Sequence, residues 1–289
     1  MVSIIIVTYN SAKYIERLLE SIFKFNKDKA FEVIVVDNNS TDGTLEIIQN
    51  SKVKSQNLKS KVKIIENKEN FGFAKGINIG AKEARGEYLL FINPDCEWNK
   101  GSLDNLVSIF EEDVNVGVAG GKILNRNLKS EKSAGKFLKT SEVFLTALGL
   151  DETFGIRFSP GRNQQVDFVS GGFMAVRRDL FARFNGFDEN LFMYIEDMEF
   201  CYRVKKEGLE VVFDPSIEVI HEGYASSSRG FAIRNIHKGL IYFQKKHGNP
   251  FSYSFVKFLL FSKSFALVVL GKIINNKYLT DTYKRMLKV

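Results

Sequence analysis

The stretch VSIIIVT at residues 2–8 is the first of four short apolar runs that decide the fold. The other three are FEVIVV at residues 31–36, VKII at 62–65 and YLLFI at 88–92. All four are rich in β-branched or aromatic residues and lack strict alternation of apolar and polar positions, as expected of strands that are covered on both faces. We therefore predict a strand at each run.

Segments with helical periodicity separate these runs. The first carries an apolar stripe at i, i+3, i+4 and i+7, formed by Ile15, Leu18, Leu19 and Ile22. Strands that alternate with helices predict the α/β class, with a mostly parallel central sheet flanked by helices. Residues 125–165 are less regular, apart from a possible helix at 140–150. A second structured portion contains residues 168–176 and a predicted helix at 196–207, and this region is expected to close near residue 220.

The composition is that of an ordinary globular protein. A chain of 289 residues with 44% hydrophobic content can bury one substantial core and carry an appendage. Its two cysteines, Cys96 and Cys201, fit no disulfide framework or metal pattern and are expected to pack as reduced thiols. The first residues show no basic segment followed by a cleavage site, so a cytoplasmic location is expected.

The positive charge is concentrated in the last part of the chain. Residues 221–289 hold 12 Lys or Arg against two acidic residues, a net of +10, so residues 1–220 must sum to −3 to give the total of +7. These basic residues flank apolar runs at 255–261 and 265–270, which favours a helical tail on an anionic membrane surface over a nucleic-acid partner. Lysines interrupt the apolar stretch, so we expect it to lie on the inner face of the plasma membrane without crossing it. Packing against the rest of the chain or a second subunit is the alternative.

Polar residues follow three of the predicted strands. These segments are TYN at residues 8–10, DNNSTDGT at 37–44 and NPD at 93–95. Any one of them can be an ordinary turn or helix cap. Ligands of open α/β sheets bind outside the carboxyl ends of the strands, so three such segments at one sheet edge indicate a site.

Together with NFGFAKGINIG at residues 70–80 and FMYIEDMEFCYR at 192–203, these segments resemble glycosyltransferase family 2. They are similar in particular to its bacterial rhamnosyltransferase-like branch, which has the GT-A fold. The resemblance covers residues 2 to about 221. It implies a GT-A catalytic domain at 1–220, with a donor-binding half at about 1–97 and an acceptor-side half at about 98–220, followed by the tail at 221–289.

The resemblance implies a pocket for a nucleoside-diphosphate sugar. Asp37 is expected to accept hydrogen bonds from the base, since a charged acceptor strengthens such bonds. Glycines and free N–H groups at a helix start let the backbone approach a diphosphate. The donor-site residues implied are Thr8, Asn10, Asp37, Asn39, Asn70, Gly72, Lys75, Asn78, Asn93 and Asp95. For Lys75, a solvent-exposed position on the helix is the alternative.

The resemblance also implies a divalent cation, Mg²⁺ or Mn²⁺. Asp95 occupies the last position of the family's DxD motif, and Asn93 replaces its first aspartate. One protein carboxylate can suffice when the phosphates of the substrate are also ligands. His221 matches a position that can supply a further metal contact, although a lone histidine can equally be structural.

Glu196 and Asp197 resemble the family's ED motif, in which the aspartate is the general base. Asp197 is expected to stay ionised because it lies near a helix N-terminus. Gly171 and Gly172 match the acceptor-side segment, or are turn residues. Glu199 and Arg203 are expected to form a simple surface pair at i, i+4.

Taken together, the resemblance implies an inverting, metal-dependent transfer of a sugar to an acceptor hydroxyl of a glycan or lipid-linked molecule. The NPD segment and the tail resemble those of rhamnosyltransferases that use dTDP-rhamnose, with galactose, glucose and N-acetylhexosamine donors left open. One rival is a non-catalytic nucleotide-sugar-binding protein, against which the set Asp37, Asp95 and Asp197 argues. The other is a sugar-phosphate nucleotidylyltransferase, which needs a Gly-rich basic loop that residues 8–12 lack.

Overall fold

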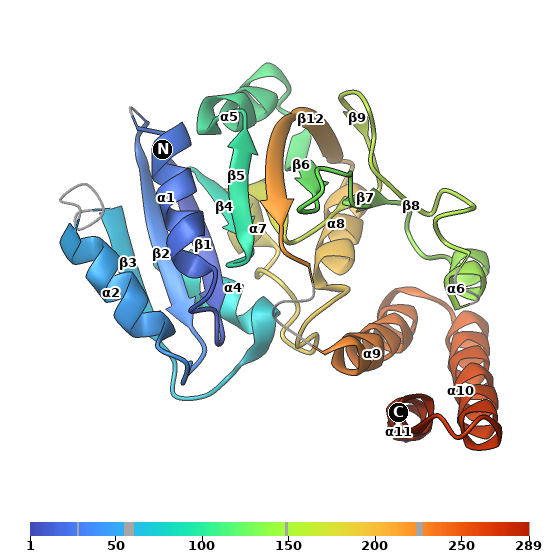
Figure 1. Ribbon diagram of the computed structural model, residues 1–289. Helices are drawn as coiled ribbons and strands as arrows, with labels where there is room; N and C mark the ends of the chain where they lie inside the picture. The colour runs from blue at the N-terminus through green and yellow to red at the C-terminus, as the bar shows by residue number, and fades with distance from the viewer. Residues whose placement is uncertain (28, 55–60, 148–149, 224–227, 289) are drawn as a thin grey trace.

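The structure is a computed structural model that describes residues 1–27, 29–54, 61–147, 150–223 and 228–288 (Figure 1). The four strands predicted from the apolar runs are confirmed as β1 (Val2–Thr8), β2 (Phe31–Asp37), β3 (Val62–Glu66) and β4 (Tyr88–Ile92). They pair in parallel in the order β3-β2-β1-β4. Helices α1 (Ile15–Phe25), α2 (Thr44–Lys54) and α4 (Gly72–Lys82) connect them.

Both faces of this sheet are covered, which explains why the runs lack a strict alternation of apolar and polar residues. Ile4 and Ile6 of β1 join the core under α1, whereas Ile5 and Val7 join the core under α4. Successive side chains of a strand point to opposite faces, so neighbouring apolar residues in a run fill both cores.

The sheet continues past β4 with strands from the second half of the chain. Its full order is β3-β2-β1-β4-β11-β6-β12-β5, and β9 pairs with β12. β11 (Phe173–Arg177) runs antiparallel to β4 and β6, whereas β6 (Val116–Leu124) and β12 (Glu210–His221) are parallel. The remaining elements are β5 (Cys96–Lys100), α5 (Leu103–Glu112), β7 (Ala134–Gly135), α6 (Thr140–Ala147), β8 (Arg157–Phe158), β9 (Gln164–Gln165), β10 (Phe168–Val169) and α7 (Arg178–Arg183).

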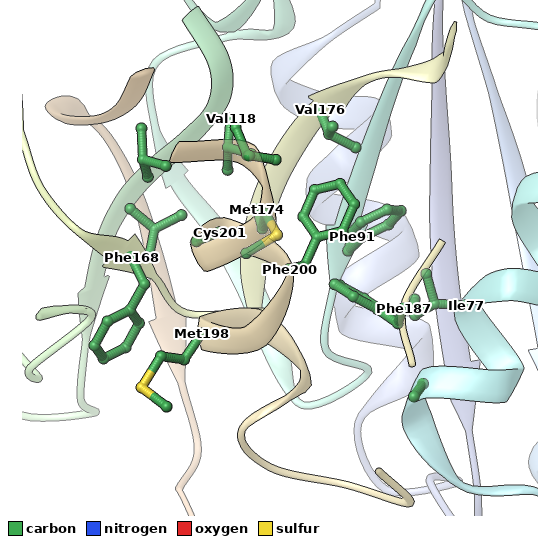
Figure 2. Packing of buried hydrophobic residues seen from close by; sticks show 14 of the residues in the cluster. Ile77, Phe91, Val118, Phe168, Met174, Val176, Phe187, Met198, Phe200 and Cys201 are labelled. Atoms are coloured by element: carbon green, nitrogen blue, oxygen red, sulfur yellow. The ribbon is translucent and has the colours of Figure 1, made fainter. Parts of the chain in front are cut away.

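Helix α8 (Glu196–Lys206) is the element that carries the ED motif, and it rests on an aromatic cluster (Figure 2). Phe200 is fully buried, and its ring centroid lies 5.5 Å from that of Phe187 and 5.2 Å from that of Phe181. The ring of Phe187 in turn lies 5.3 Å from that of Phe91 of β4. This packing fixes the height of α8 over the sheet and thus the place of its first turn.

Three helices form the C-terminal tail: α9 (Arg229–His247), α10 (Pro250–Ile273) and α11 (Lys277–Met286). Leu240 and Phe243 of α9, with Val256 and Leu260 of α10, belong to the same buried core as α8. One face of α9 and one face of α10 therefore pack against the rest of the chain, which was the alternative to membrane binding for the tail. Figure 1 shows α10 and α11 at the side of the molecule away from β1–β3.

The expected surface pair of Glu199 and Arg203 is wrong. The carboxylate of Glu199 is fully buried, and it is shared by Arg203 at 2.8 Å, Lys246 at 2.8 Å and His247 at 2.9 Å. Sequence spacing identified the pairing within α8, but the two partners from α9 come from tertiary packing. Glu199 thus anchors the tail to the helix of the ED motif.

Candidate active site

A cavity of about 360 Å³ opens at the carboxyl ends of β1, β2 and β4, the sheet edge where α/β folds bind ligands. One wall consists of strand ends and the start of α4: Val7, Tyr9, Ser11, Asn38, Asn70, Gly72, Phe73, Asn93 and Pro94. The other wall is formed by Phe192 and Met193, just before α8, and by Ser228 and Phe231 of the tail. The polar strand ends singled out in the sequence therefore meet at one cavity.

Thr8 and Asp37 lock the ends of the first two strands together. The buried carboxylate of Asp37 accepts a hydrogen bond from the Thr8 hydroxyl at 2.8 Å. It also accepts bonds from the backbone N–H of Ser40 at 2.8 Å and from its hydroxyl at 2.6 Å. These contacts hold the loop after β2 at the cavity edge.

Asn10 and Asn39 both have left-handed backbones, with φ of 53° and 63°, which asparagine tolerates better than most residues. The side-chain oxygen of Asn10 accepts the N–H of Thr41 at 2.8 Å, while Asn39 is exposed. Asn38, which we did not predict, lines the cavity and donates to the carbonyl of Gly72 at 3.0 Å. Its place next to Asp37 in a polar run was the only signal in the sequence.

At the start of α4, Gly72 has φ +83° and makes room for Phe192. A Cβ at Gly72 would lie 2.3 Å from the Phe192 carbonyl oxygen, so the close approach is to the protein's own chain. The ammonium of Lys75 lies 4.0 Å from the centre of the Phe71 ring, a cation–π contact. Asn70 lines the cavity, as expected.

Asn78 does not line the cavity. Its side-chain oxygen accepts the N–H of Phe187 at 2.9 Å, and its nitrogen donates to the Phe187 carbonyl at 2.8 Å. Both polar ends of this buried side chain are thus used to fix the segment ahead of α8. We correct the donor-site expectation for Asn78 to this structural role.

Asp95 lies between β4 and β5 and is 4% exposed. Neither of its carboxylate oxygens has a hydrogen-bond partner in the described part of the chain. The Nε2 atom of His221 lies 3.5 Å from the Oδ1 atom of Asp95. A buried carboxylate without hydrogen bonds is costly unless something else satisfies it, and a divalent cation can do so.

His221, at the end of β12, joins Asp95 to Glu131. The Nδ1 atom of His221 lies 2.9 Å from a Glu131 oxygen, an arrangement that commonly orients a metal-binding imidazole. Burial lowers the pKa of His221, but the carboxylates of Asp95 and Glu131 outweigh it and raise the pKa to about 10. A cation bound at Nε2 of His221 would take the place of the proton on that nitrogen.

No group of three or more His, Cys, Asp or Glu in metal-binding geometry exists among the described residues. Glu131 lies in the irregular region, so the sequence carried no signal for it.

Asp197, in the first turn of α8, is held by two backbone N–H groups. Its carboxylate accepts from Gly171 at 2.9 Å and from Met198 at 2.7 Å. Burial nevertheless outweighs these bonds and raises the pKa of Asp197 above its usual value. The position at a helix start favours the ionised form of Asp197, whereas burial opposes it, so both effects act on this carboxylate.

Glu196 is a buried neighbour of the expected base. It is 4% exposed, and burial together with the charge of Asp197 raises its pKa well above the usual value. The two residues before it, Tyr194 and Ile195, have left-handed backbones with φ of 70° and 73°. This conformation costs a non-glycine residue about 1–3 kcal/mol and is rare for a β-branched one.

A short chain of contacts joins the two acidic motifs. Gly171 donates to Asp197, and the carbonyl of the adjacent Gly172 accepts the N–H of Asn93 at 3.1 Å. The structure therefore brings the loop of Asp95, the two glycines and Asp197 together from three separate segments. A carboxylate able to accept a proton lies near a carboxylate able to hold a cation, beside a cavity lined by amides and aromatic rings.

Comparison with known proteins identifies the family of this chain. The family described as Glycosyl transferase family 2 matches residues 3–184, and that described as N-terminal domain of galactosyltransferase matches residues 158–224. The chain is 26% identical over 251 residues to an N-acetylglucosaminyl-diphospho-decaprenol L-rhamnosyltransferase of Mycobacterium tuberculosis, covering 78% of this chain and 77% of the relative. It is 28% identical over 242 residues to rhamnosyltransferase WbbL of Escherichia coli, covering 80% and 87%.

Solved structures show the same fold. The mannosyltransferase PcManGT from Pyrobaculum calidifontis, in complex with GDP-Man and Mn²⁺, superimposes with a TM-score of 0.59 at 18% identity, covering 99% of this chain and 84% of that one. GalNAc-T7 with UDP, GalNAc and Mn²⁺ gives a TM-score of 0.61 at 17% identity, covering 90% of this chain and 54% of that one. With its GT-A fold and its rhamnosyltransferase-like relatives, the chain belongs to glycosyltransferase family 2.

Proposed function

We propose that this protein is an inverting glycosyltransferase that moves L-rhamnose from dTDP-rhamnose to an acceptor hydroxyl of a glycan or lipid-linked molecule. The family match supports a glycosyltransferase in glycan synthesis, and the names of the relatives suggest the sugar and a lipid-linked acceptor. The observation that carries the chemistry is the contact chain from Asp197 through Gly171 and Gly172 to the loop of Asp95.

In this proposal Asp197 takes the proton of the acceptor hydroxyl as its oxygen bonds to C1 of the sugar. The bond between C1 and the diphosphate oxygen breaks, and the nucleoside diphosphate leaves from the opposite face. A base with a raised pKa holds the proton better, provided that it is ionised when the acceptor arrives. The Gly171 N–H keeps the Asp197 carboxylate in place for this transfer.

The proposed cation is Mg²⁺ or Mn²⁺, held by Asp95 with His221, and Glu131 orients the imidazole. When bound, it would neutralise the charge that develops on the leaving diphosphate. The unpartnered oxygens of Asp95 fit this role. Two of the GT-A structures named above contain Mn²⁺, which supports the choice of metal.

The test is to incubate the purified protein with dTDP-rhamnose and other nucleotide sugars, with Mn²⁺, Mg²⁺ or a chelator, and to measure the nucleoside diphosphate released. We expect metal-dependent turnover of dTDP-rhamnose. Asp197→Asn should lower turnover by about 10²-fold or more while leaving dTDP affinity nearly unchanged. A protein that binds dTDP-rhamnose but releases no product would be a binding protein, and wild-type turnover in Asp197→Asn would assign the base elsewhere.

We also propose that the tail places the enzyme on an anionic membrane surface at the cytoplasmic face. Helix α10 exposes large apolar side chains, including Phe251, Phe258 and Phe265, which are 75%, 69% and 56% exposed. By length and composition α10 could also cross a membrane, since an 18-residue window within it has a mean hydropathy of 1.7. Exposed Lys257 and Lys272 flank the aromatic side chains, which suits a helix lying in the interface. Lys263 is instead half-buried against the protein.

Sedimentation with vesicles containing phosphatidylserine tests this placement. The wild-type chain should pellet at low salt and be partly released at high salt. The variant Phe258→Glu with Phe265→Glu should stay in solution, because both changes are at exposed positions of α10. Phe154→Glu is the matched control, since Phe154 is also exposed, at 58%, but lies outside the tail. Equal sedimentation of all three proteins would argue against the membrane role.

A further inference from the structure

Helix α9 contacts the segment that carries Asp197 on both sides of that residue. Helix α9 begins at Arg229, beyond residue 224, at which the second of the two matching family segments ends. Phe231 of α9 packs edge-on against Phe192 with ring centroids 6.0 Å apart, and both rings line the cavity. Two further contacts, at Gly239 and at Lys246 with His247, lie progressively further along the helix.

Gly239 lies against the strained turn that precedes α8. A Cβ at this position would lie 2.7 Å from Cγ1 of Ile195, 2.9 Å from its Cβ and 3.3 Å from the carbonyl oxygen of Tyr194. Tyr194 and Ile195 hold left-handed backbones, which persist only where the surrounding structure enforces them. Because glycine lacks a side chain, the backbone of α9 presses directly on this turn, two residues before Asp197.

The second anchor lies two residues after Asp197. The buried carboxylate of Glu199 binds Lys246 and His247 of α9, and Lys246 also binds Asp188 ahead of the turn. The hydroxyl of Tyr242 donates to the same Asp188 carboxylate at 2.8 Å. Helix α9 therefore holds the chain before and after Asp197, while Asp197 itself makes its bonds to Gly171 and Met198.

We propose that α9 is a positioning element of the active site and that Gly239 is the positioning residue that keeps the Tyr194–Ile195 turn, and with it Asp197, in the reactive arrangement. The inference rests on the proposed role of Asp197 as the base. It assigns the first tail helix to the catalytic unit, leaving the exposed face of α10 for the membrane.

The first test replaces Gly239 by alanine and measures hydrolysis of dTDP-rhamnose, with water as acceptor and Mn²⁺ present. The new methyl group meets the Cβ of Ile195, which cannot rotate away, so the turn must shift. We expect kcat to fall at least about 10-fold with KM for the donor within about twofold of wild type, since small misplacements of a reacting group are costly. Gly230→Ala is the matched control on the same helix, because its nearest neighbour is the rotatable hydroxyl of Thr282 at 3.1 Å.

A rescue variant separates positioning from general destabilisation. In Ile195→Gly with Gly239→Ala the colliding side chain is gone, and glycine adopts the left-handed backbone without strain. We expect this double variant to regain most of the lost kcat. An unchanged kcat in Gly239→Ala, or a double variant as impaired as the single one, would overturn the proposal.

A readout independent of turnover distinguishes a failure of this inference from a failure of the proposed function. Hydrogen exchange of the peptide containing Gly171 reports on the N–H that Asp197 holds, and Gly239→Ala should speed that exchange. Lys246→Met loosens the second anchor at a half-exposed site and should have the same effect. If neither variant changes this exchange, α9 does not position Asp197, whatever the substrate is. If both change it while no nucleotide sugar turns over, only the proposed function fails.

Discussion

Replacing Glu199 by glutamine should destabilise the protein in a pH-dependent way. The carboxylate is fully buried among Arg203 of α8 and Lys246 and His247 of α9. Glutamine has nearly the same shape but no charge, so the variant keeps the packing and removes the anion that Arg203 and Lys246 contact inside the protein. Removing one partner of a buried ion pair is far more costly than removing an exposed pair.

The magnitude follows from the pKa of Glu199. Burial alone raises it, but the hydrogen bonds from His247, Arg203 and Lys246 outweigh burial and lower the pKa from 4.5 to about 2. A gap of about 2.5 between the pKa values of the unfolded and folded states corresponds to roughly 3 kcal/mol at neutral pH. Because the folded-state pKa is the lower one, this stability is complete above about pH 5 and is lost as the pH falls toward 2.

Urea unfolding at pH 7 and pH 3, followed by far-UV circular dichroism and the fluorescence of the single tryptophan, Trp98, measures the effect. We expect Glu199→Gln to lower the free energy of unfolding by roughly 3 kcal/mol at pH 7 and by about half of that at pH 3. Glu83→Gln is the control, because Glu83 pairs with Lys63 at the surface, where both side chains are about half exposed. A loss below about 1 kcal/mol at pH 7, or an equal loss at both pH values, would refute the reasoning.

Two further predictions concern the cavity. Asp95→Asn should abolish the gain in dTDP affinity that Mn²⁺ provides, measured by calorimetric titration with and without the metal, and an unchanged gain would place the cation elsewhere. Gly72→Ala should lower the thermal stability much more than Gly43→Ala. Both glycines have positive φ, +83° and +87°, but only at Gly72 would the new methyl group collide, 2.3 Å from the Phe192 carbonyl oxygen, whereas Gly43 has nothing within 4 Å. Equal losses would show that backbone conformation alone is responsible.

The sequence by itself determined the first half of the fold. The four apolar runs became β1 to β4 because a strand covered on both faces needs apolar residues at neighbouring positions as well as at alternate ones. It also placed the polar strand ends at one cavity, since parallel strands share the edge at which they end. Asn70, Gly72 and Asn93, which we expect to bind the donor, are among the residues that line that cavity. The helix predicted at residues 196–207 is observed at 196–206.

Only the tertiary structure decided which residues are partners. Glu131 contacts His221, and the carboxylate of Glu199 is buried against Lys246 and His247 of α9, although local spacing made Glu199 look like half of a surface pair. Asn78 lies in the same motif as the expected donor-site residues, yet its side-chain nitrogen and oxygen are both hydrogen-bonded to the backbone of Phe187. Nothing in the sequence distinguishes Gly239 from the other glycines of the basic tail, and only the structure shows that it packs against Ile195. Periodicity records which face of an element is covered, whereas the charge, hydrogen bonds and close contacts of a residue depend on what other elements bring to it.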